Sequence, residues 1–247
     1  MKIIGIIPAR YASSRFPGKP LVDIAGKSMI QRVYEQVKNT GCLNEVIVAT
    51  DDSRIEEHVR SFAGNVVMTS SSHQSGTDRC AEVVSKVTGF DIAINIQGDE
   101  PFINPLQIEL LASCFNQEQT QIATLVKKIH TEDELFNVNI PKVVRNIRGE
   151  AIYFSRQTIP YLRGVEQKEW LSKQTYFKHI GIYGYRTAIL EKLTQLPIST
   201  LEEVEALEQL RWIENGYAIQ TAETEHETIA VDTKEDLERI MQTYFTK

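Results

Sequence analysis

The chain has 247 residues, of which 42% are hydrophobic and 24% are charged, and its formal net charge is −6. This length suits one or two domains, and the acidic balance argues against a nucleic-acid-binding protein, whose binding face is usually basic. The N-terminus does not resemble a signal peptide and no apolar run approaches the length of a transmembrane helix, so we expect a cytoplasmic protein without a membrane partner.

The first predicted strand leads directly into a basic loop. Residues 3–7 are an unbroken apolar run, typical of a strand buried on both faces, and we expect Pro8 to end it because proline cannot donate to a sheet ladder. The loop that follows is rich in small residues and carries Arg10, Arg15 and Lys19. Open α/β sheets bind ligands beyond the carboxyl ends of their strands, so this loop is a candidate polyphosphate site. The alternative is an ordinary solvated basic loop.

Strands and helices then alternate in a way that predicts a mostly parallel sheet. We expect strands over 46–50, 66–69 and 92–96. We expect helices over 29–38 and 53–62, and a third helix that is capped by Thr77 or Asp78 and runs to about Val87. Residues 26–28 resemble the end of a P-loop, but Leu21 stands where that motif requires its first glycine, so we reject it.

Two aspartates follow predicted strands and are candidate metal ligands. Asp99 lies in Gln97-Gly98-Asp99-Glu100-Pro101, directly after the strand over 92–96, and Asp232 ends a predicted strand over 229–233. A carboxylate at the ligand edge of the sheet suits Mg²⁺, although a turn aspartate is the simpler alternative. If the two aspartates meet, they and the two cations Arg10 and Lys19 suit attack on an α-phosphate with pyrophosphate leaving.

The second half of the chain has a different pattern. A helix over 105–115 and a strand over 122–129 precede three strand-like segments with little helix between them, at 142–145, 151–156 and 179–185. We expect an antiparallel arm over about 142–186, inserted before the chain returns to the main layer. The aromatic residues over 159–176 form either an association surface or a local core. Ser199 and Glu202 then predict a capped helix that runs to Gly216, a strand follows over 217–222, and Thr233 is expected to cap the last helix.

Several motifs carry a resemblance to a known family. PARYASSRFPGKPL resembles the signature of the sugar-activating nucleotidyltransferases, in particular the cytidylyltransferases that make CMP-3-deoxy-manno-octulosonate (CMP-Kdo). VATDD, HQSGTDR, NIQGDEP, AIYFSR, KHIGIYGYR, LEQLRW and VDTKEDLE follow in family order, so the resemblance covers essentially the whole chain. It implies a single α/β domain over 1–247 with a three-layer, Rossmann-like nucleotidyltransferase fold. It also implies transfer of CMP from CTP to the anomeric 2-hydroxyl of Kdo, for lipopolysaccharide biosynthesis.

The resemblance also implies roles for individual residues. It places the triphosphate against Arg10, Arg15 and Lys19, and the cytosine and ribose beside His73, Gln74, Ser75 and Gly76. It assigns Mg²⁺ to Asp99 and Asp232. It lines the sugar pocket with Gln97, Arg156, His179, Tyr183, Glu208 and Gln209, among which Arg156 and His179 offer positive charge to the sugar carboxylate. It further implies a homodimer formed through the arm.

Three other functions remain open at this level. The nearest is a sister nucleotidyltransferase acting on sialic acid or on an amino-substituted Kdo. A non-catalytic nucleotide-binding protein would have been favoured by the loss of Lys19, Asp99 or Asp232, and all three are present. A glycosyltransferase of similar fold would carry an Asp-x-Asp motif, and Asp51-Asp52 does not match it. The sequence does not reveal which group accepts the proton of the sugar hydroxyl.

The cysteines add one further expectation. Cys42, Cys80 and Cys114 are widely spaced and odd in number, so we expect free thiols rather than a disulfide or zinc set.

Overall fold

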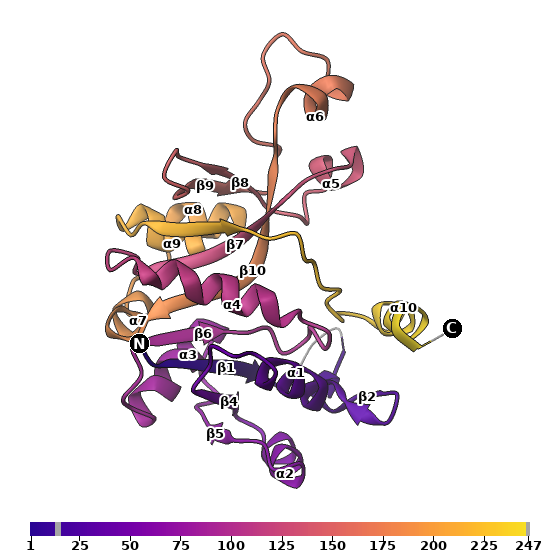
Figure 1. Ribbon diagram of the computed structural model, residues 1–247, viewed down its shortest axis with the longest axis vertical. Helices are drawn as coiled ribbons and strands as arrows, with labels where there is room; N and C mark the ends of the chain where they lie inside the picture. The colour runs from indigo at the N-terminus through magenta and orange to yellow at the C-terminus, as the bar shows by residue number, and fades with distance from the viewer. Residues whose placement is uncertain (13–15, 246–247) are drawn as a thin grey trace.

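The computed structural model describes residues 1–12 and 16–245, and within them nine strands form one sheet (Figure 1). The strand order is β11 (Ile219–Glu223), β7 (Ile122–Lys128), β10 (Phe177–Arg186), β6 (Ile92–Asn95), β1 (Ile3–Ala9), β4 (Glu45–Thr50) and β5 (Val66–Met68). Within this order of seven strands, all neighbouring pairs are parallel except those of β10, which runs antiparallel to β6 and β7. The predicted α/β fold with a mostly parallel sheet and an antiparallel part is confirmed.

Helices cover both faces of this sheet. Alternate residues of β1 point to opposite faces: Ile3 and Ile7 belong to one buried cluster, and Ile4 and Ile6 to the other. The first cluster includes side chains of α1 (Met29–Lys38), α2 (Ser53–Ser61), α4 (Pro105–Ser113) and α10 (Lys234–Phe245). The second includes side chains of α3 (Gly76–Lys86), α7 (Thr187–Thr194) and α9 (Gln209–Glu214). The result is the three-layer arrangement that the sequence predicts.

Shorter elements complete the chain. A small hairpin of β2 (Asp23–Ile24) and β3 (Lys27–Ser28) precedes α1, and α8 (Thr200–Glu205) precedes α9. Three 3₁₀ helices span Lys19–Leu21, Cys114–Asn116 and Gln167–Glu169 within the described residues. None of the helices between Met1 and Phe245, apart from positions 13–15, has both the length and the apolarity needed to cross a membrane. Cys42, Cys80 and Cys114 are free, as expected.

Pro8 does not end the first strand, contrary to our prediction. β1 continues to Ala9, and Pro8 stays in register with Ala49 of β4. The carbonyl of Pro8 faces Gly98, beyond the last residue of β6, and the nitrogen of a strand residue points to the same side as its carbonyl. The missing N–H therefore removes no ladder hydrogen bond, because no strand lies on that side of Pro8.

The predicted antiparallel arm is divided between the main sheet and a projection. β10 is a central strand, whereas β8 (Lys142–Arg145) and β9 (Ala151–Ser155) pair beside its first residues. Figure 1 shows the segment with α5 (Glu132–Phe136) and α6 (Trp170–Lys173) projecting at one end of the molecule. Trp170 and Tyr176 are buried there in a small core, while Tyr161 is 72% exposed. The local core is therefore the correct interpretation for two of the aromatic residues.

The C-terminal segment returns to the sheet edge. Figure 1 shows it leaving β11 and running to α10, whose N-terminus is capped by Thr233 as predicted. The rings of Phe102 and Tyr244 stack with centroids 4.0 Å apart and anchor the end of α10. Residues 229–233 do not form the predicted strand: 229–232 have no regular secondary structure and Thr233 lies in a bend. This segment contacts the site through isolated bonds, such as the hydrogen bond from Val231 N to the Asp99 carbonyl, 2.9 Å.

Candidate active site

The candidate site lies where β1 and β6 end side by side. A cavity of about 400 Å³ opens there, lined by Pro8, Ala9, Arg10, Ala12, Lys19, Pro20, Gly76, Arg79, Gln97, Gly98 and Asp99. Gly98 is required at this edge, because a Cβ at its position would lie 2.6 Å from the Pro8 carbonyl oxygen. The site therefore occupies the strand edge at which open α/β sheets bind ligands.

Lys19 brings the two predicted metal ligands together. Its Nζ lies 2.8 Å from Asp99 Oδ2 and 3.1 Å from Asp232 Oδ1. Lys19 follows Gly18, whose positive φ of 74° turns the chain into the 3₁₀ helix. The three residues are separated by 80 and 213 positions in the sequence, yet the two carboxylates converge on one cation. The assumed proximity of Asp99 and Asp232 is confirmed.

A partly buried carboxyl group lies next to this ion-pair cluster. Desolvation by burial, and then the charges of Asp99 and Glu227, together raise the pKa of Glu100 to about 8. Glu100 is therefore mostly protonated at pH 7 in the free protein and adds little negative charge beside Asp99 and Asp232.

Arg10 joins the loop after β1 to the loop before α3. Its guanidinium donates to the carbonyl oxygens of His73 (3.5 Å) and Gln74 (3.2 Å). The α3 helix is capped by Ser75 rather than by Thr77 or Asp78: Ser75 Oγ accepts from Asp78 N, and Asp78 accepts from Ser75 N. A full capping box forms because Asp78 occupies the third helical position. Arg15 lies outside the described residues.

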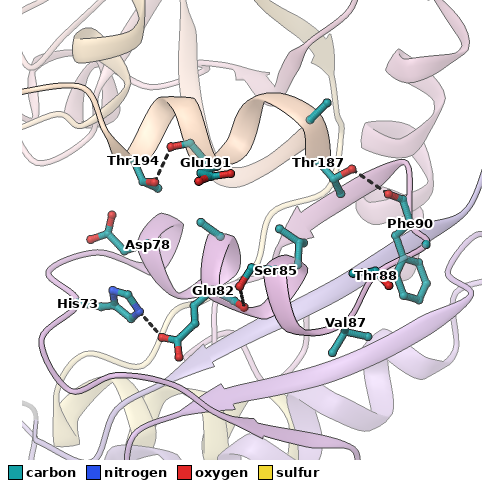
Figure 2. A pocket seen from close by; sticks show the side chains of 14 residues that line it. His73, Asp78, Glu82, Ser85, Val87, Thr88, Phe90, Thr187, Glu191 and Thr194 are labelled. Atoms are coloured by element: carbon teal, nitrogen blue, oxygen red, sulfur yellow. Dashed lines mark hydrogen bonds and ion pairs between the residues drawn. The ribbon is translucent and has the colours of Figure 1, made fainter.

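The side chains of this second loop point in different directions. Gln74 Nε2 donates to the Ser72 carbonyl, 2.9 Å, while the imidazole of His73 pairs with Glu82 of α3. Figure 2 shows His73 and Glu82 on the wall of a separate groove of about 700 Å³ between α3 and α7. Neither Arg10 nor Lys19 lines this groove, and its His73 end belongs to the loop bound by Arg10. This groove is thus distinct from the cavity that Arg10 and Lys19 line.

Arg79 is a residue of the site to which the sequence analysis gave no role. It lines the cavity although its side chain is 0% exposed, and its Nη1 donates to Thr69 Oγ1, 2.7 Å. Its Nη2 lies 3.0 Å from Asp51 Oδ2. The sequence contains both residues within recognised motifs, since Arg79 ends HQSGTDR and Asp51 belongs to VATDD. Only the fold shows that these two motifs contact each other.

The predicted sugar residues on β10 form a part-buried neutral cluster. Thr124 Oγ1 lies 3.0 Å from His179 Nε2 and donates to the Ile182 carbonyl, 2.7 Å, while Gln97 Nε2 donates to the Gly181 carbonyl, 2.7 Å. Burial lowers the pKa of His179 to about 4. The imidazole is therefore neutral at pH 7 in the free protein, where it does not supply the positive charge expected of it.

Tyr183 lies next to His179 on the same strand and is also buried. The ring centroids are 5.2 Å apart, and burial first, then the Glu208 charge, raises the pKa of Tyr183 well above its usual value. The hydroxyl of Tyr183 has no hydrogen-bond partner among the described residues. A buried hydroxyl without a partner is unfavourable, so this group is suited to a ligand or an ordered water.

Arg156 explains why the predicted helix from Ser199 to Gly216 is interrupted. Its guanidinium donates to the carbonyl oxygens of Glu205 (2.6 Å), Ala206 (3.2 Å) and Val138 (3.3 Å). Ala206 has a φ of 50° and separates α8 from α9, while the Ser199 capping box forms as predicted. The Arg156 contacts use carbonyls that a continuous helix would require for itself.

Glu208 and Gln209 lie at the start of α9. Thr77 Oγ1 donates to Glu208 Oε2, 2.8 Å, which joins α9 to α3. Burial raises the pKa of Glu208, although the hydrogen bonds from Thr77 and Ser75 act in the opposite direction. Gln209 is 5% exposed and its Nε2 has no partner among the described residues.

Comparison with known proteins places this geometry in a family. A family model described as "Cytidylyltransferase" matches residues 4–229. A 3-deoxy-manno-octulosonate cytidylyltransferase from Parabacteroides distasonis is 59% identical over 98% of this chain and 97% of the relative. The chain belongs to the 3-deoxy-manno-octulosonate cytidylyltransferases.

Further comparisons agree with this family membership. A 3-deoxy-manno-octulosonate cytidylyltransferase from Porphyromonas gingivalis is 52% identical over 96% of this chain and 94% of the relative. A CMP:2-keto-3-deoxy-manno-octonic acid synthetase, solved in complex with CTP, superposes with a TM-score of 0.91 at 45% identity over 98% of both chains. A cytidylyltransferase from Leptospira borgpetersenii, at 18% identity and a TM-score of 0.65, shares the fold.

Proposed function

We propose that the protein transfers CMP from CTP to the anomeric 2-hydroxyl of 3-deoxy-manno-octulosonate (Kdo), releasing pyrophosphate. The new bond joins the sugar oxygen to the α-phosphorus, the α–β phosphoanhydride bond breaks, and the hydroxyl proton leaves. The observation that carries this proposal is the convergence of Asp99 and Asp232 on Lys19 beside Arg10, at the strand edge of a cytidylyltransferase fold. The names of the relatives supply the nucleotide and the sugar.

The cationic side chains of the site suit a triphosphate. Arg10 and Lys19 line the same cavity and lie at the carboxyl end of β1. In this function they neutralise charge on the phosphoryl oxygens and hold the leaving pyrophosphate in line with the attacking oxygen. Catalysis of this kind depends mainly on position and charge.

Asp99 and Asp232 fit a divalent cation. Both carboxylates contact one ammonium group, so they already converge on a point of positive charge. No group of three or more metal-ligating side chains exists among residues 1–12 and 16–245, so the remaining ligands would be phosphate oxygens and waters, as Mg²⁺ prefers. Mg²⁺ bound there would neutralise the phosphates and polarise the reacting phosphoryl group. Lys19 would have to release the two carboxylates.

The sugar is expected against the neutral cluster on β10 and the start of α9. Tyr183 and Gln209 offer buried polar atoms without partners, which suit sugar hydroxyls. Arg156 is the positively charged group among the predicted sugar residues, and its position near the break between α8 and α9 suits an acidic sugar. No proton acceptor is assigned.

A homodimer and a cytoplasmic location belong to the same proposal. The projection carries exposed apolar side chains, including Tyr161 and Val138 at 72% and 50% exposure, which suit an association surface. Three free cysteines suit a reducing compartment.

The function is tested by measuring pyrophosphate release with CTP and Mg²⁺ across Kdo, 8-amino-Kdo, sialic acid and a sugar-free control. Release with Kdo, dependent on Mg²⁺, is the expected result. Release with another sugar alone would assign the pocket to that sugar. CTP binding without release from any sugar would support a non-catalytic nucleotide-binding protein.

A further inference from the structure

Thr77 connects two parts of the active site that are distant in the sequence. It is the second residue of α3, is 2% exposed, and its hydroxyl donates to the Glu208 carboxylate at 2.8 Å across 131 residues of sequence. A hydrogen bond to a charged acceptor is stronger than a neutral one. The bond therefore fixes the N-terminus of α3 against the N-terminus of α9.

On the nucleotide side, the first turn of α3 holds the loop that Arg10 contacts. Asp78 Oδ2 accepts from the backbone N–H groups of Gln74 (3.2 Å) and Ser75 (3.0 Å). Arg10 donates to the carbonyl oxygens of the same loop. A nucleotide that contacts Arg10 and this loop would therefore also fix the position of the adjacent Thr77.

On the sugar side, Glu208 stands among buried polar atoms that lack partners. Gln209 Nε2 and the hydroxyls of Tyr183 and Tyr185 make no hydrogen bond among the described residues. The charge of Glu208 contributes to the raised pKa of both tyrosines, so the carboxylate lies near them. Unpartnered buried donors are arranged here around the acceptor that Thr77 orients.

We propose that Thr77 is a positioning residue that couples nucleotide binding to sugar binding through Glu208. The inference rests on the proposed function, since it takes the two sides as the CTP and Kdo sites. With nucleotide bound, the loop, α3 and Thr77 are held, and Glu208 and Gln209 are fixed for the sugar. Sugar binds more tightly to the nucleotide complex than to the free protein, and linkage makes the effect reciprocal.

The coupling is measured as the ratio of Kdo dissociation constants without and with α,β-methylene-CTP, by titration calorimetry on the full chain. The methylene group prevents cleavage of the α–β bond, so no turnover occurs. We expect a ratio of about tenfold in the wild type, the typical size of an allosteric coupling. Thr77→Val, which removes the hydroxyl and keeps the shape, lowers the ratio toward one, and Thr77→Ser restores it.

Two further variants separate positioning from stability. Thr187→Val is the matched control: Thr187 Oγ1 also donates to a distant acceptor, the Phe90 carbonyl at 2.8 Å, but it lies by the groove between α3 and α7 in Figure 2. We expect it to keep the wild-type ratio. In turnover, Thr77→Val raises the KM for Kdo more than it lowers kcat, and adding Glu208→Gln to it has little further effect on the ratio.

The outcomes distinguish a failure of the coupling from a failure of the proposed function. A wild-type ratio of one in an enzyme that turns over Kdo would overturn the coupling and leave the proposed function intact. An unchanged ratio in Thr77→Val, or no rescue by Thr77→Ser, would also overturn it. Wild-type protein that neither binds nor turns over Kdo would remove the proposed function together with the inference.

Discussion

On the nucleotide side of the active site, charged side chains already have partners within the chain, whereas on the sugar side polar atoms are buried without partners. Lys19 forms ion pairs with both Asp99 and Asp232, and Arg10 donates to backbone carbonyls. Tyr183 and Gln209, in contrast, bury unpaired donors. In the free protein, Lys19 and Arg10 therefore already have partners, whereas the polar atoms of Tyr183 and Gln209 do not. Ligands must exchange contacts on the nucleotide side and add them on the sugar side.

The largest expected effect follows from removing the charge of Asp99. Asp99→Asn keeps the size of the side chain but weakens both the Lys19 contact and the proposed metal site. We expect kcat for pyrophosphate release to fall by about 10³-fold or more, since charge stabilisation dominates phosphoryl transfer. Retention of even a tenth of wild-type kcat would contradict the role of Asp99; circular dichroism checks that the variant is folded.

Lys19→Met tests the exchange of contacts directly. Without the ammonium group, kcat should fall by about 10²-fold because the triphosphate loses a cation. In the absence of nucleotide, however, Mn²⁺ should bind more tightly to the variant, since Lys19 no longer competes for Asp99 and Asp232. Titration of Mn²⁺ by electron paramagnetic resonance measures this. Weaker Mn²⁺ binding in the variant would show that Lys19 does not compete with the metal.

Tyr183→Phe tests the sugar side. Removing an unpartnered buried hydroxyl should leave the free energy of unfolding unchanged or raise it by up to about 1 kcal/mol. The KM for Kdo should rise about tenfold, while the KM for CTP stays constant. Chemical denaturation and steady-state kinetics measure the two effects. A destabilised variant with an unchanged KM for Kdo would mean that the hydroxyl serves the fold instead.

The smallest effect concerns the neutral imidazole of His179. Its pKa in the folded protein, about 4, lies below its ordinary value of 6.5, so the unfolded chain binds more protons between these values. Its contribution to stability is complete above about pH 6.5 and is lost as pH falls toward 4. We expect this loss to be about 1–2 kcal/mol, since the ring keeps partial exposure.

The His179 effect is isolated by comparison with His179→Gln. The difference in unfolding free energy between wild type and variant should shrink from pH 7 to pH 4.5, as followed by urea denaturation. A difference that is constant with pH would show that His179 does not titrate in this range.

Local sequence patterns correctly predicted those helices and strands whose limits are set by residues adjacent in the sequence. The apolar run before the basic loop, the capping box at Ser199 and the stop of α1 after Lys38 depend on adjacent residues. Motif resemblance placed Lys19, Asp99 and Asp232 in one site before the fold brought them together. Such features are visible in a sequence because each depends on a few nearby residues.

The errors arose where distant residues decide the local structure. Pro8 continues its strand because β6 ends early, and α8 ends at Ala206 because Arg156 binds the local carbonyls. β10 enters the main sheet between β6 and β7, which no pattern within its own sequence reveals. The neutral state of His179 likewise depends on residues distant in the sequence, which remove its ring from water.

The most direct test of the central claim is a ³¹P NMR time course of the purified protein with CTP, Mg²⁺ and Kdo. The account predicts that the three CTP resonances are replaced by a phosphodiester resonance of CMP-Kdo and by pyrophosphate in equal amounts, with neither product formed when Kdo is omitted. Formation of CMP or CDP at the same rate without Kdo, or no change with Kdo present, would contradict it.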